Sequence, residues 1–216
     1  MLYILGGASR SGKSMVARRF VSEKQIPFFC IDFLITPLQE IPSLNIKHGQ
    51  PFISKAEKLW PLVKPLLIHL IKAEPNYLIE GDGILPNQVA ELLKGFSSDI
   101  KACFVGFSEI NPQDKFKQVR KLDGDGNKDD WTKNISDEKL MSYIKNMVKF
   151  SKYLKSECNK YDISYFDSSN NFSECLESVV QYLANQVRKS SHYINIGPNS
   201  SSVSKKNVLS ALTLGS

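Results

Sequence analysis

The feature that most constrains the fold is a glycine-rich segment near the N-terminus. Residues Gly7–Ser14 read G-A-S-R-S-G-K-S and fit the phosphate-binding pattern G-x-x-x-x-G-K-[ST]. They follow directly on the apolar run 1–5, so a strand leads into a loop that opens a helix. Glycine permits the tight backbone turn that aims several N–H groups and a helix N-terminus at an anion. This phosphate-binding loop (Gly7–Ser14) therefore predicts a nucleotide site.

The loop also assigns individual roles. The predicted nucleotide-binding residues are Gly7, Ala8, Ser9, Arg10, Ser11, Gly12, Lys13 and Ser14. In this pattern the lysine reaches the β- and γ-phosphates, and the hydroxyl that follows it ligates Mg²⁺. Lys13 is thus a predicted catalytic residue, Ser14 is a predicted metal ligand, and the expected cofactors are ATP and Mg²⁺.

The composition is that of an ordinary globular domain. The 216 residues are 42% hydrophobic and 23% charged, which is enough to build a full core. The formal charge of +6 is spread thinly, so a bound nucleotide alone could account for the basic excess. No apolar stretch approaches the roughly 20 residues needed to span a bilayer, and no signal-peptide pattern precedes the first strand. We therefore expect a cytoplasmic protein with no membrane partner and leave its oligomeric state open.

Neither the cysteines nor the histidines predict a disulfide or a metal site. The cysteines form no C-x-x-C pair and fall inside predicted strands or helices: Cys30, Cys103, Cys158 and Cys175. We expect them to be buried free thiols. The histidines are scattered, without a second one at metal-ligand spacing.

Short apolar runs alternate with amphipathic stretches after the loop. The predicted strands are residues 1–5, 26–31, 76–79, 100–107 and 163–166. The predicted helices are residues 13–21, 54–73, 86–94, 112–121, 136–159 and 173–187. Nearly continuous apolar strands that alternate with helices indicate a five-stranded parallel sheet covered on both faces, a three-layer α/β/α domain. We expect this domain to occupy residues 1–188, and we predict a disordered tail over the serine-rich residues 189–216.

Over residues 1–187 the arrangement resembles the small P-loop kinases, which include nucleoside monophosphate kinases, chloramphenicol phosphotransferases, zeta-toxin-type kinases and polynucleotide 5′-hydroxyl kinases. The segments S-R-S-G-K-S (9–14), I-D-F (31–33) and I-E-G-D (79–82) are similar to those of little-characterised bacterial proteins labelled adenylate kinase or 2-phosphoglycerate kinase. Only the first segment is a specific motif. The resemblance implies a P-loop NTPase fold and ATP-dependent phosphoryl transfer.

Asp32 is the predicted catalytic base. It follows the second predicted strand, and in hydroxyl kinases of this group an aspartate in that place accepts the proton of the acceptor. A carboxylate there would also orient the acceptor hydroxyl. The alternative is a turn or helix-cap aspartate, which is common after strands.

Two further acidic residues follow the third predicted strand. The resemblance places Glu80 where adenylate kinases carry an aspartate, and it implies that Glu80 helps to hold Mg²⁺ or contacts the acceptor. Asp82, in the same segment, is a predicted acceptor contact.

Arginine is missing where the nucleoside monophosphate kinases use it to grip the acceptor phosphate. None occurs between Arg19 and Arg120. Lysines such as Lys47 or Lys55 could bind a phosphate only as point charges, without the bidentate fork of arginine. This departure favours a hydroxyl acceptor.

Arg120 is the third predicted catalytic residue. It precedes an acidic stretch between two predicted helices, where this group of kinases keeps a mobile lid, here at about residues 120–135. On closure, its guanidinium would clamp the transferring phosphate.

The predicted function is therefore an ATP- and Mg²⁺-dependent kinase that moves the γ-phosphate to a small-molecule acceptor, with a hydroxyl favoured. A polynucleotide 5′-hydroxyl kinase is one alternative, although the thin spread of lysine argues against a nucleic-acid partner. A nucleotide-dependent switch or binding protein is the other, because P-loop folds host many activities.

Overall fold

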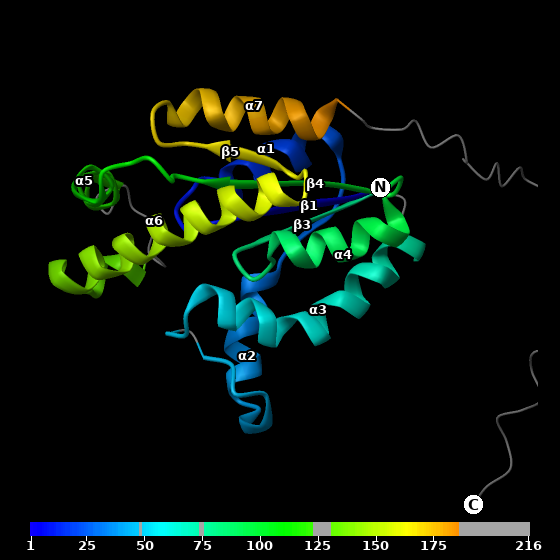
Figure 1. Cartoon of the computed structure of the whole chain (residues 1–216), viewed down its shortest axis with the longest axis horizontal. Helices are drawn as coiled ribbons and strands as arrows, with labels where there is room; N and C mark the ends of the chain where they lie inside the picture. Colours follow the sequence, from blue (N-terminus) through cyan, green and yellow to red (C-terminus); the bar gives the residue numbers. More distant parts are fainter. Residues whose placement is uncertain (48, 74–75, 123–130, 186–216) are drawn as a thin grey trace, which may run out of the picture.

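The computed structural model describes residues 1–47, 49–73, 76–122 and 131–185 (Figure 1). The strands are β1 (Leu2–Gly7), β2 (Phe28–Cys30), β3 (Tyr77–Gly81), β4 (Ile100–Gly106) and β5 (Ser164–Asp167). The α-helices are α1 (Lys13–Lys24), α2 (Ile35–Gln39), α3 (Phe52–Ala73), α4 (Pro86–Phe96), α5 (Pro112–Leu122), α6 (Asp137–Lys160) and α7 (Phe172–Ala184). Short 3₁₀ helices are η1 (Ile31–Leu34), η2 (Pro42–Leu44) and η3 (Trp131–Asn134).

All five strands run parallel in the order β2-β3-β1-β4-β5. β1 lies at the centre, and its Leu5 is opposite Glu80 of β3 and Cys103 of β4. The predicted five-stranded parallel sheet is therefore confirmed. The order also puts the ends of β3 and β1 side by side, so the phosphate-binding loop and the acidic segment after β3 meet at one edge.

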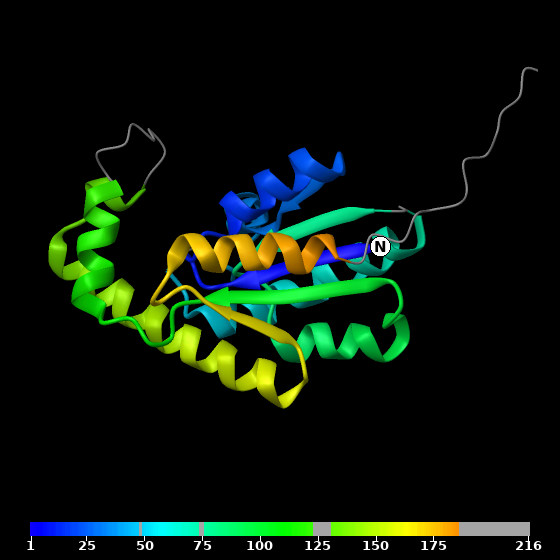
Figure 2. The same ribbon diagram turned by 90° about the horizontal axis from the view of Figure 1, so that it is seen from above.

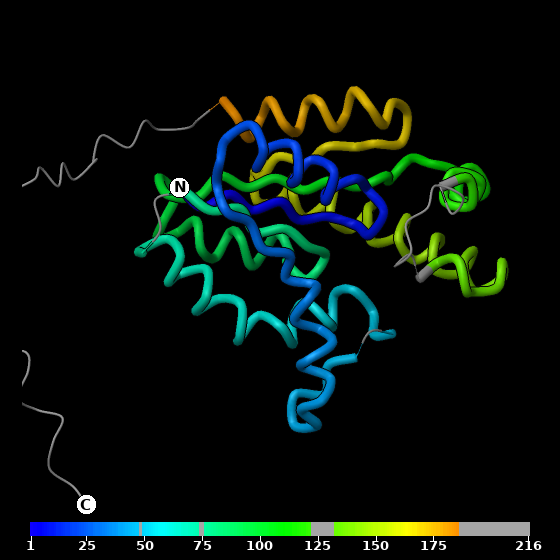
Figure 3. Tube along the Cα trace, turned by 180° about the vertical axis from the view of Figure 1, so that it is seen from behind, coloured from blue at the N-terminus to red at the C-terminus, as the bar shows by residue number. Residues whose placement is uncertain are grey.

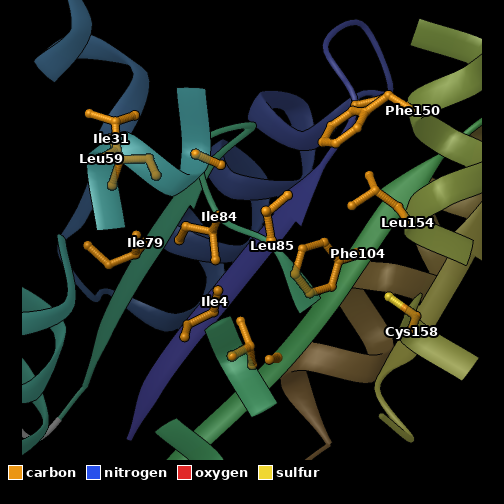
Figure 4. Close-up of a cluster of buried hydrophobic side chains, with 14 of the residues drawn as sticks. Ile4, Ile31, Leu59, Ile79, Ile84, Leu85, Phe104, Phe150, Leu154 and Cys158 are labelled. Carbon is orange, nitrogen blue, oxygen red and sulfur yellow. The ribbon is translucent and has the colours of Figure 1, made fainter. Parts of the chain in front are cut away.

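Helices cover both faces of the sheet, as Figures 2 and 3 show from above and from behind. Because side chains alternate along a strand, β1 sends Tyr3 and Leu5 to the face covered by α1 and α7, and Leu2 and Ile4 to the opposite face. Figure 4 shows the second face, where Phe104 of β4 lies among side chains of α6 and of the segment after β3. The predicted three-layer α/β/α architecture is confirmed.

The boundaries differ from the predicted ones where proline or a short helix intervenes. β2 is shorter than predicted because Pro27 has no N–H to add to a ladder and Ile31 already begins η1. α2 and the three 3₁₀ helices were not predicted. The start of α6 agrees, since Ser136 is its N-cap and accepts a hydrogen bond from Lys139 N at 3.4 Å.

The structure does not describe two parts of the predicted domain organisation. They are the predicted tail (189–216) and residues 123–130 of the predicted lid, which lie outside the described residues. In the described part of the chain, no helix has the length and apolar character needed to cross a membrane. The four cysteines are unpaired, and three of them are buried; Cys30 is half-buried.

Candidate active site

The phosphate-binding loop joins β1 to α1 at the carboxyl edge of the sheet. Gly7 has φ 143° and Gly12 has φ 95°, in the region that favours glycine. A Cβ on Gly7 would lie only 2.1 Å from the carbonyl oxygen of Val105, so this position tolerates no side chain. The Lys13 ammonium is buried and donates a hydrogen bond to the Ala8 carbonyl at 2.8 Å. The side chain of Lys13 therefore folds back over the phosphate-binding loop.

Ser14 and Glu80, the two predicted metal ligands, are in direct contact. Ser14 Oγ donates a hydrogen bond to Glu80 Oε1 at 2.8 Å, and Glu80 is buried near the end of β3. Within the described ranges, no three side chains of His, Cys, Asp or Glu lie close enough together to hold a metal ion. The pair thus offers one hydroxyl and one carboxylate beside the loop.

Asp32 and Asp82 form a carboxylate pair beyond the loop. The backbone N–H of Asp82 donates to Asp32 Oδ1 at 3.2 Å and to Oδ2 at 3.1 Å. The Asp82 carboxylate accepts a hydrogen bond from Ser9 Oγ at 2.7 Å and forms an ion pair with Lys55 Nζ at 2.9 Å. Lys55 and Asp82 are 5% and 4% exposed, so this ion pair is buried. One network thereby ties the loop, the end of β3 and the start of α3 together.

Gly81 allows the two aspartates to approach one another. It has φ 154°, and a Cβ there would lie 2.5 Å from Ile31 Cγ1 and 3.0 Å from Asp32 Oδ1. Any side chain would push η1, and with it Asp32, away from the end of β3. The glycine of the I-E-G-D segment is therefore a positioning residue.

The two carboxylates have opposite electrostatic surroundings. Burial and the negative charge of Asp82 raise the pKa of Asp32 well above its ordinary value. Burial also works against the charge of Asp82, but the ion pair with Lys55, aided by Lys13 and Ser9, holds the pKa of Asp82 below its ordinary value. Asp82 therefore stays ionised to lower pH, and Asp32 is the carboxylate that gains and loses a proton nearer neutral pH.

A cavity of about 630 Å³ opens between these groups. Its lining comes from the loop, η1, α2, the turn before α3, α3, the segment after β3 and α6: Ser9, Asp32, Ile35, Gly49, Lys55, Asp82 and Tyr143. We call it the carboxylate cavity. The predicted acceptor residues Asp32 and Asp82 face it together, whereas Glu80 instead lies against Ser14.

Arg120 is held away from the carboxylate cavity. Its guanidinium donates to the carbonyls of Thr132 and Ile135 at 2.9 and 2.8 Å, and forms an ion pair with Asp137 at 2.6 Å. It thereby joins the end of α5 to the start of α6. Its predicted role as a phosphate clamp stays a prediction, and it requires these bonds to be exchanged.

A second cation of α5 lies nearer to the loop. Lys115 is buried, donates a hydrogen bond to the Arg10 carbonyl at 2.9 Å and lies 4.2 Å from the ring centre of Phe107. Burial lowers the pKa of Lys115 to about 8. No sequence signal predicts this contact, because helical periodicity does not say which loop a helix will face.

Tyr143 shares the apolar stripe of its helix with Leu140 and Ile144, and this spacing predicts a core residue. Leu140 and Ile144 are fully buried, but Tyr143 is half-buried and lines the carboxylate cavity. Burial raises the pKa of its hydroxyl to about 12, although an interaction with Ser9 works against this. Its hydroxyl, on a mostly apolar helix face, was the signal available in the sequence.

Comparisons with known proteins agree with the fold. A crystal structure of a gluconokinase from Sinorhizobium meliloti 1021 matches with a TM-score of 0.55 and 15% identity over 85% of this chain and 91% of that one. Shikimate kinases from Bacteroides thetaiotaomicron and Acinetobacter baumannii, the latter in complex with shikimate, match with a TM-score of 0.49 each. Their identities are 19% and 17%, over 86% and 87% of this chain and 96% and 95% of theirs.

No protein-family model matches the sequence, and no curated protein matches it significantly. The chain thus has the fold of the small P-loop kinases, as its resemblance implied, and the gluconokinase match supports this. At this level of identity the likeness concerns the fold alone.

Proposed function

We propose that this protein is an ATP- and Mg²⁺-dependent phosphotransferase that moves the γ-phosphate to a hydroxyl of a small molecule. The observation that carries the proposal is the carboxylate cavity. One wall of it is Ser9 of the phosphate-binding loop, and Asp32 and Asp82 lie on the other walls. An acceptor bound there is next to the predicted phosphate site and within reach of a carboxylate of raised pKa.

The loop fits a nucleotide. The positive φ of Gly7 and Gly12 bends the backbone around a space at the N-terminus of α1, where N–H groups and the helix dipole favour an anion. Lys13 is held at this loop by the Ala8 carbonyl. On nucleotide binding, its ammonium would exchange that carbonyl for the β- and γ-phosphate oxygens.

Ser14 and Glu80 fit a hard cation. A serine hydroxyl and a buried carboxylate are oxygen ligands of the kind that Mg²⁺ accepts, and phosphate oxygens and water supply the rest in such sites. When bound, Mg²⁺ neutralises the charge that develops on the transferring phosphate. Ser14 would hold the ion directly, and Glu80 would orient it from the end of β3.

Asp32 would act as the base. Its carboxylate accepts the proton of the acceptor hydroxyl while that oxygen forms a bond to the γ-phosphorus and the bond to the β–γ bridging oxygen breaks, so ADP leaves. Its raised pKa makes Asp32 a stronger base than an ordinary aspartate. Asp82, held ionised by Lys55, would keep that pKa high and accept a hydrogen bond from the acceptor.

The charges of the carboxylate cavity favour a hydroxyl over a phosphate as the acceptor group. Its lining holds two carboxylates, and its lysine, Lys55, is already paired with Asp82. A phosphorylated acceptor would have to compete with Asp82 for the ammonium of Lys55. A neutral alcohol instead finds hydroxyl and carboxylate partners on several sides.

ADP release with Mg-ATP tests the proposal, measured with and without pooled alcohols, nucleosides, nucleoside monophosphates, aminoglycosides and 5′-hydroxyl oligonucleotides. We expect one pool of small alcohols to accelerate turnover, and Lys13→Ala to remove both turnover and ATP binding. Acceleration only by oligonucleotides, with an affinity that falls steeply with salt, would favour the polynucleotide kinase. ATP binding without acceleration by any pool would favour the nucleotide-dependent switch.

A further inference from the structure

A second cavity adjoins the carboxylate cavity and differs from it in chemistry. It measures about 410 Å³ and lies between the start of α3 and the middle of α6. Its lining residues are Gly49, Gln50, Pro51, Phe52, Ile53, Tyr143, Asn146, Lys149, Phe150 and Tyr153. Because four of these are aromatic, we call it the aromatic cavity.

Three of the four rings of the aromatic cavity are nearly parallel. Phe52 and Phe150 are stacked at 4.8 Å between ring centres and 16° between planes, and Phe150 and Tyr153 follow at 6.1 Å and 14°. Tyr143 is tilted by 60° against Phe52, at 5.7 Å. Nearly parallel faces next to an open space suit a further planar ring, which can stack on them or meet their edges.

The two cavities are adjacent and share part of their lining. Gly49 and Tyr143 line both of them. Lys55 also connects them, because its ammonium pairs with Asp82 in the carboxylate cavity and lies 5.4 Å from the ring centre of Phe52. A molecule with a hydroxyl at Asp32 that extends past Tyr143 would therefore reach the aromatic cavity.

The size of the aromatic cavity decides what can enter it. An apolar cavity of about 150 Å³ already accepts benzene, so 410 Å³ holds a substituted or fused ring. Polar groups stand at its exposed side, where Asn146 and Lys149 are solvent-accessible. Ring nitrogens or carbonyl oxygens could bond to them without being buried.

We propose that the acceptor is a neutral alcohol that carries a planar aromatic ring, with its hydroxyl at Asp32 and its ring in the aromatic cavity. Nucleosides and aryl glycols belong to this class, whereas sugars and simple polyols do not. The assignment of the hydroxyl rests on the proposed function. The assignment of the ring rests on the aromatic cavity alone.

The test compares acceptors that share a hydroxyl group and differ in the ring. The pairs are a nucleoside against the methyl riboside, and phenyl glycol against methyl glycol. For each compound, ADP release gives kcat/KM, and saturation-transfer NMR gives binding independently of turnover. We expect the ring to raise kcat/KM at least about tenfold and to account for the binding signal.

A blocking variant separates the cavity from the rest of the site. Asn146→Trp places a large ring at the solvent-exposed rim of the aromatic cavity without removing a core side chain. Its control is Lys145→Trp, at the preceding position of α6, which is also exposed but does not line the cavity. We expect Asn146→Trp to lose about tenfold in kcat/KM for the ring-bearing compounds only. Lys145→Trp should behave as the wild type.

The outcomes distinguish the two proposals. Turnover of both members of each pair at equal kcat/KM would overturn the aromatic acceptor and leave the kinase standing. Binding of the ring-bearing compounds that Asn146→Trp abolishes, without any turnover, would support the aromatic cavity and count against the kinase. The absence of both binding and turnover would overturn both.

Discussion

At the scale of single residues, the site depends on two aspartates whose charges are kept unequal. Asp82 has Lys55 and Ser9 as partners, whereas Asp32 faces Asp82 and accepts hydrogen bonds from the backbone N–H of that residue. Like charges at close range disfavour a second ionisation, so the pKa of Asp32 is raised while the pKa of Asp82 is held down. This difference in partners gives each carboxylate its own predicted task.

The pH dependence of turnover follows from the raised pKa of Asp32. Only the ionised carboxylate can accept a proton, so activity is present above this pKa and is lost as the pH falls through it. We expect the acid limb of kcat/KM to lie well above the ordinary aspartate value of 3.8, and a pH profile of the wild type measures it. The positive charge of Lys55 lowers the pKa of Asp32, so Lys55→Met should raise this pKa and move the acid limb to higher pH. An acid limb near 3.8 in the wild type would contradict the role of Asp32.

Asp32→Asn should abolish transfer and leave ATP binding nearly unchanged. The amide keeps the shape but cannot accept the proton, so we expect kcat to fall at least about a hundredfold. Turnover and ATP affinity, measured on the same preparation, check this. Equal loss of both would instead assign Asp32 to nucleotide binding.

The same variant should be more stable than the wild type at neutral pH. A carboxyl of raised pKa binds its proton more tightly in the folded chain, so its stabilising effect is present below the ordinary value and is lost as pH rises toward the raised one. The substituted amide carries no charge and avoids this loss. We expect Tm to rise by a few degrees for Asp32→Asn near neutral pH, with the difference vanishing in acid, as thermal unfolding at several pH values would show.

At the scale of elements, the end of β3 and the short η1 position Asp32 and Asp82 through Gly81. Register pairs Cys30 of β2 with Glu80 of β3, so the next residues of both segments necessarily meet. Only a residue without Cβ allows them to meet this closely. The geometry of the acidic pair is therefore a property of two strand ends rather than of either aspartate.

Gly81→Ala should lower both stability and activity. Its Cβ would contact Ile31 and Asp32 at 2.5 and 3.0 Å, and φ 154° is unfavourable for alanine. We expect a loss of roughly 1–3 kcal/mol in the free energy of unfolding and a fall in kcat. Gly95→Ala, inside α4 with nothing within 4 Å of its Cβ, is the matched control and should be neutral or stabilising in denaturant unfolding.

The sequence could predict most of the elements and could not predict how they meet. Hydrophobic period and the loop motif were sufficient for five parallel strands and for six helices, because these signals are local. The strand order and the unpredicted α2 depend on contacts between distant segments. Tyr143 illustrates the limit. Its spacing placed it on the apolar face of α6 that packs on the core, but only the packing of the neighbouring elements leaves a cavity beside this residue.

At the scale of the whole molecule, the fold brings three predicted groups to one edge of the sheet. The phosphate-binding loop, Asp32 and the segment 80–82 were each predicted to follow the carboxyl end of a strand, and they lie together because the carboxyl ends of β1, β2 and β3 are neighbours. Lys55, Lys115 and the aromatic cavity come from helices, whose lateral position the sequence does not encode locally. Those are the parts to which we assign the proposed selectivity for the acceptor.

The most direct test of the account is ³¹P NMR of the wild-type protein with Mg-ATP and the ring-bearing alcohols. We predict that the γ-phosphate resonance disappears while ADP and a new phosphate monoester appear in equal amounts. Inorganic phosphate as the sole new product would contradict the account and indicate a hydrolytic switch. A new phosphoanhydride, formed only when a nucleoside monophosphate is added, would contradict the hydroxyl acceptor and indicate that the protein is a nucleoside monophosphate kinase.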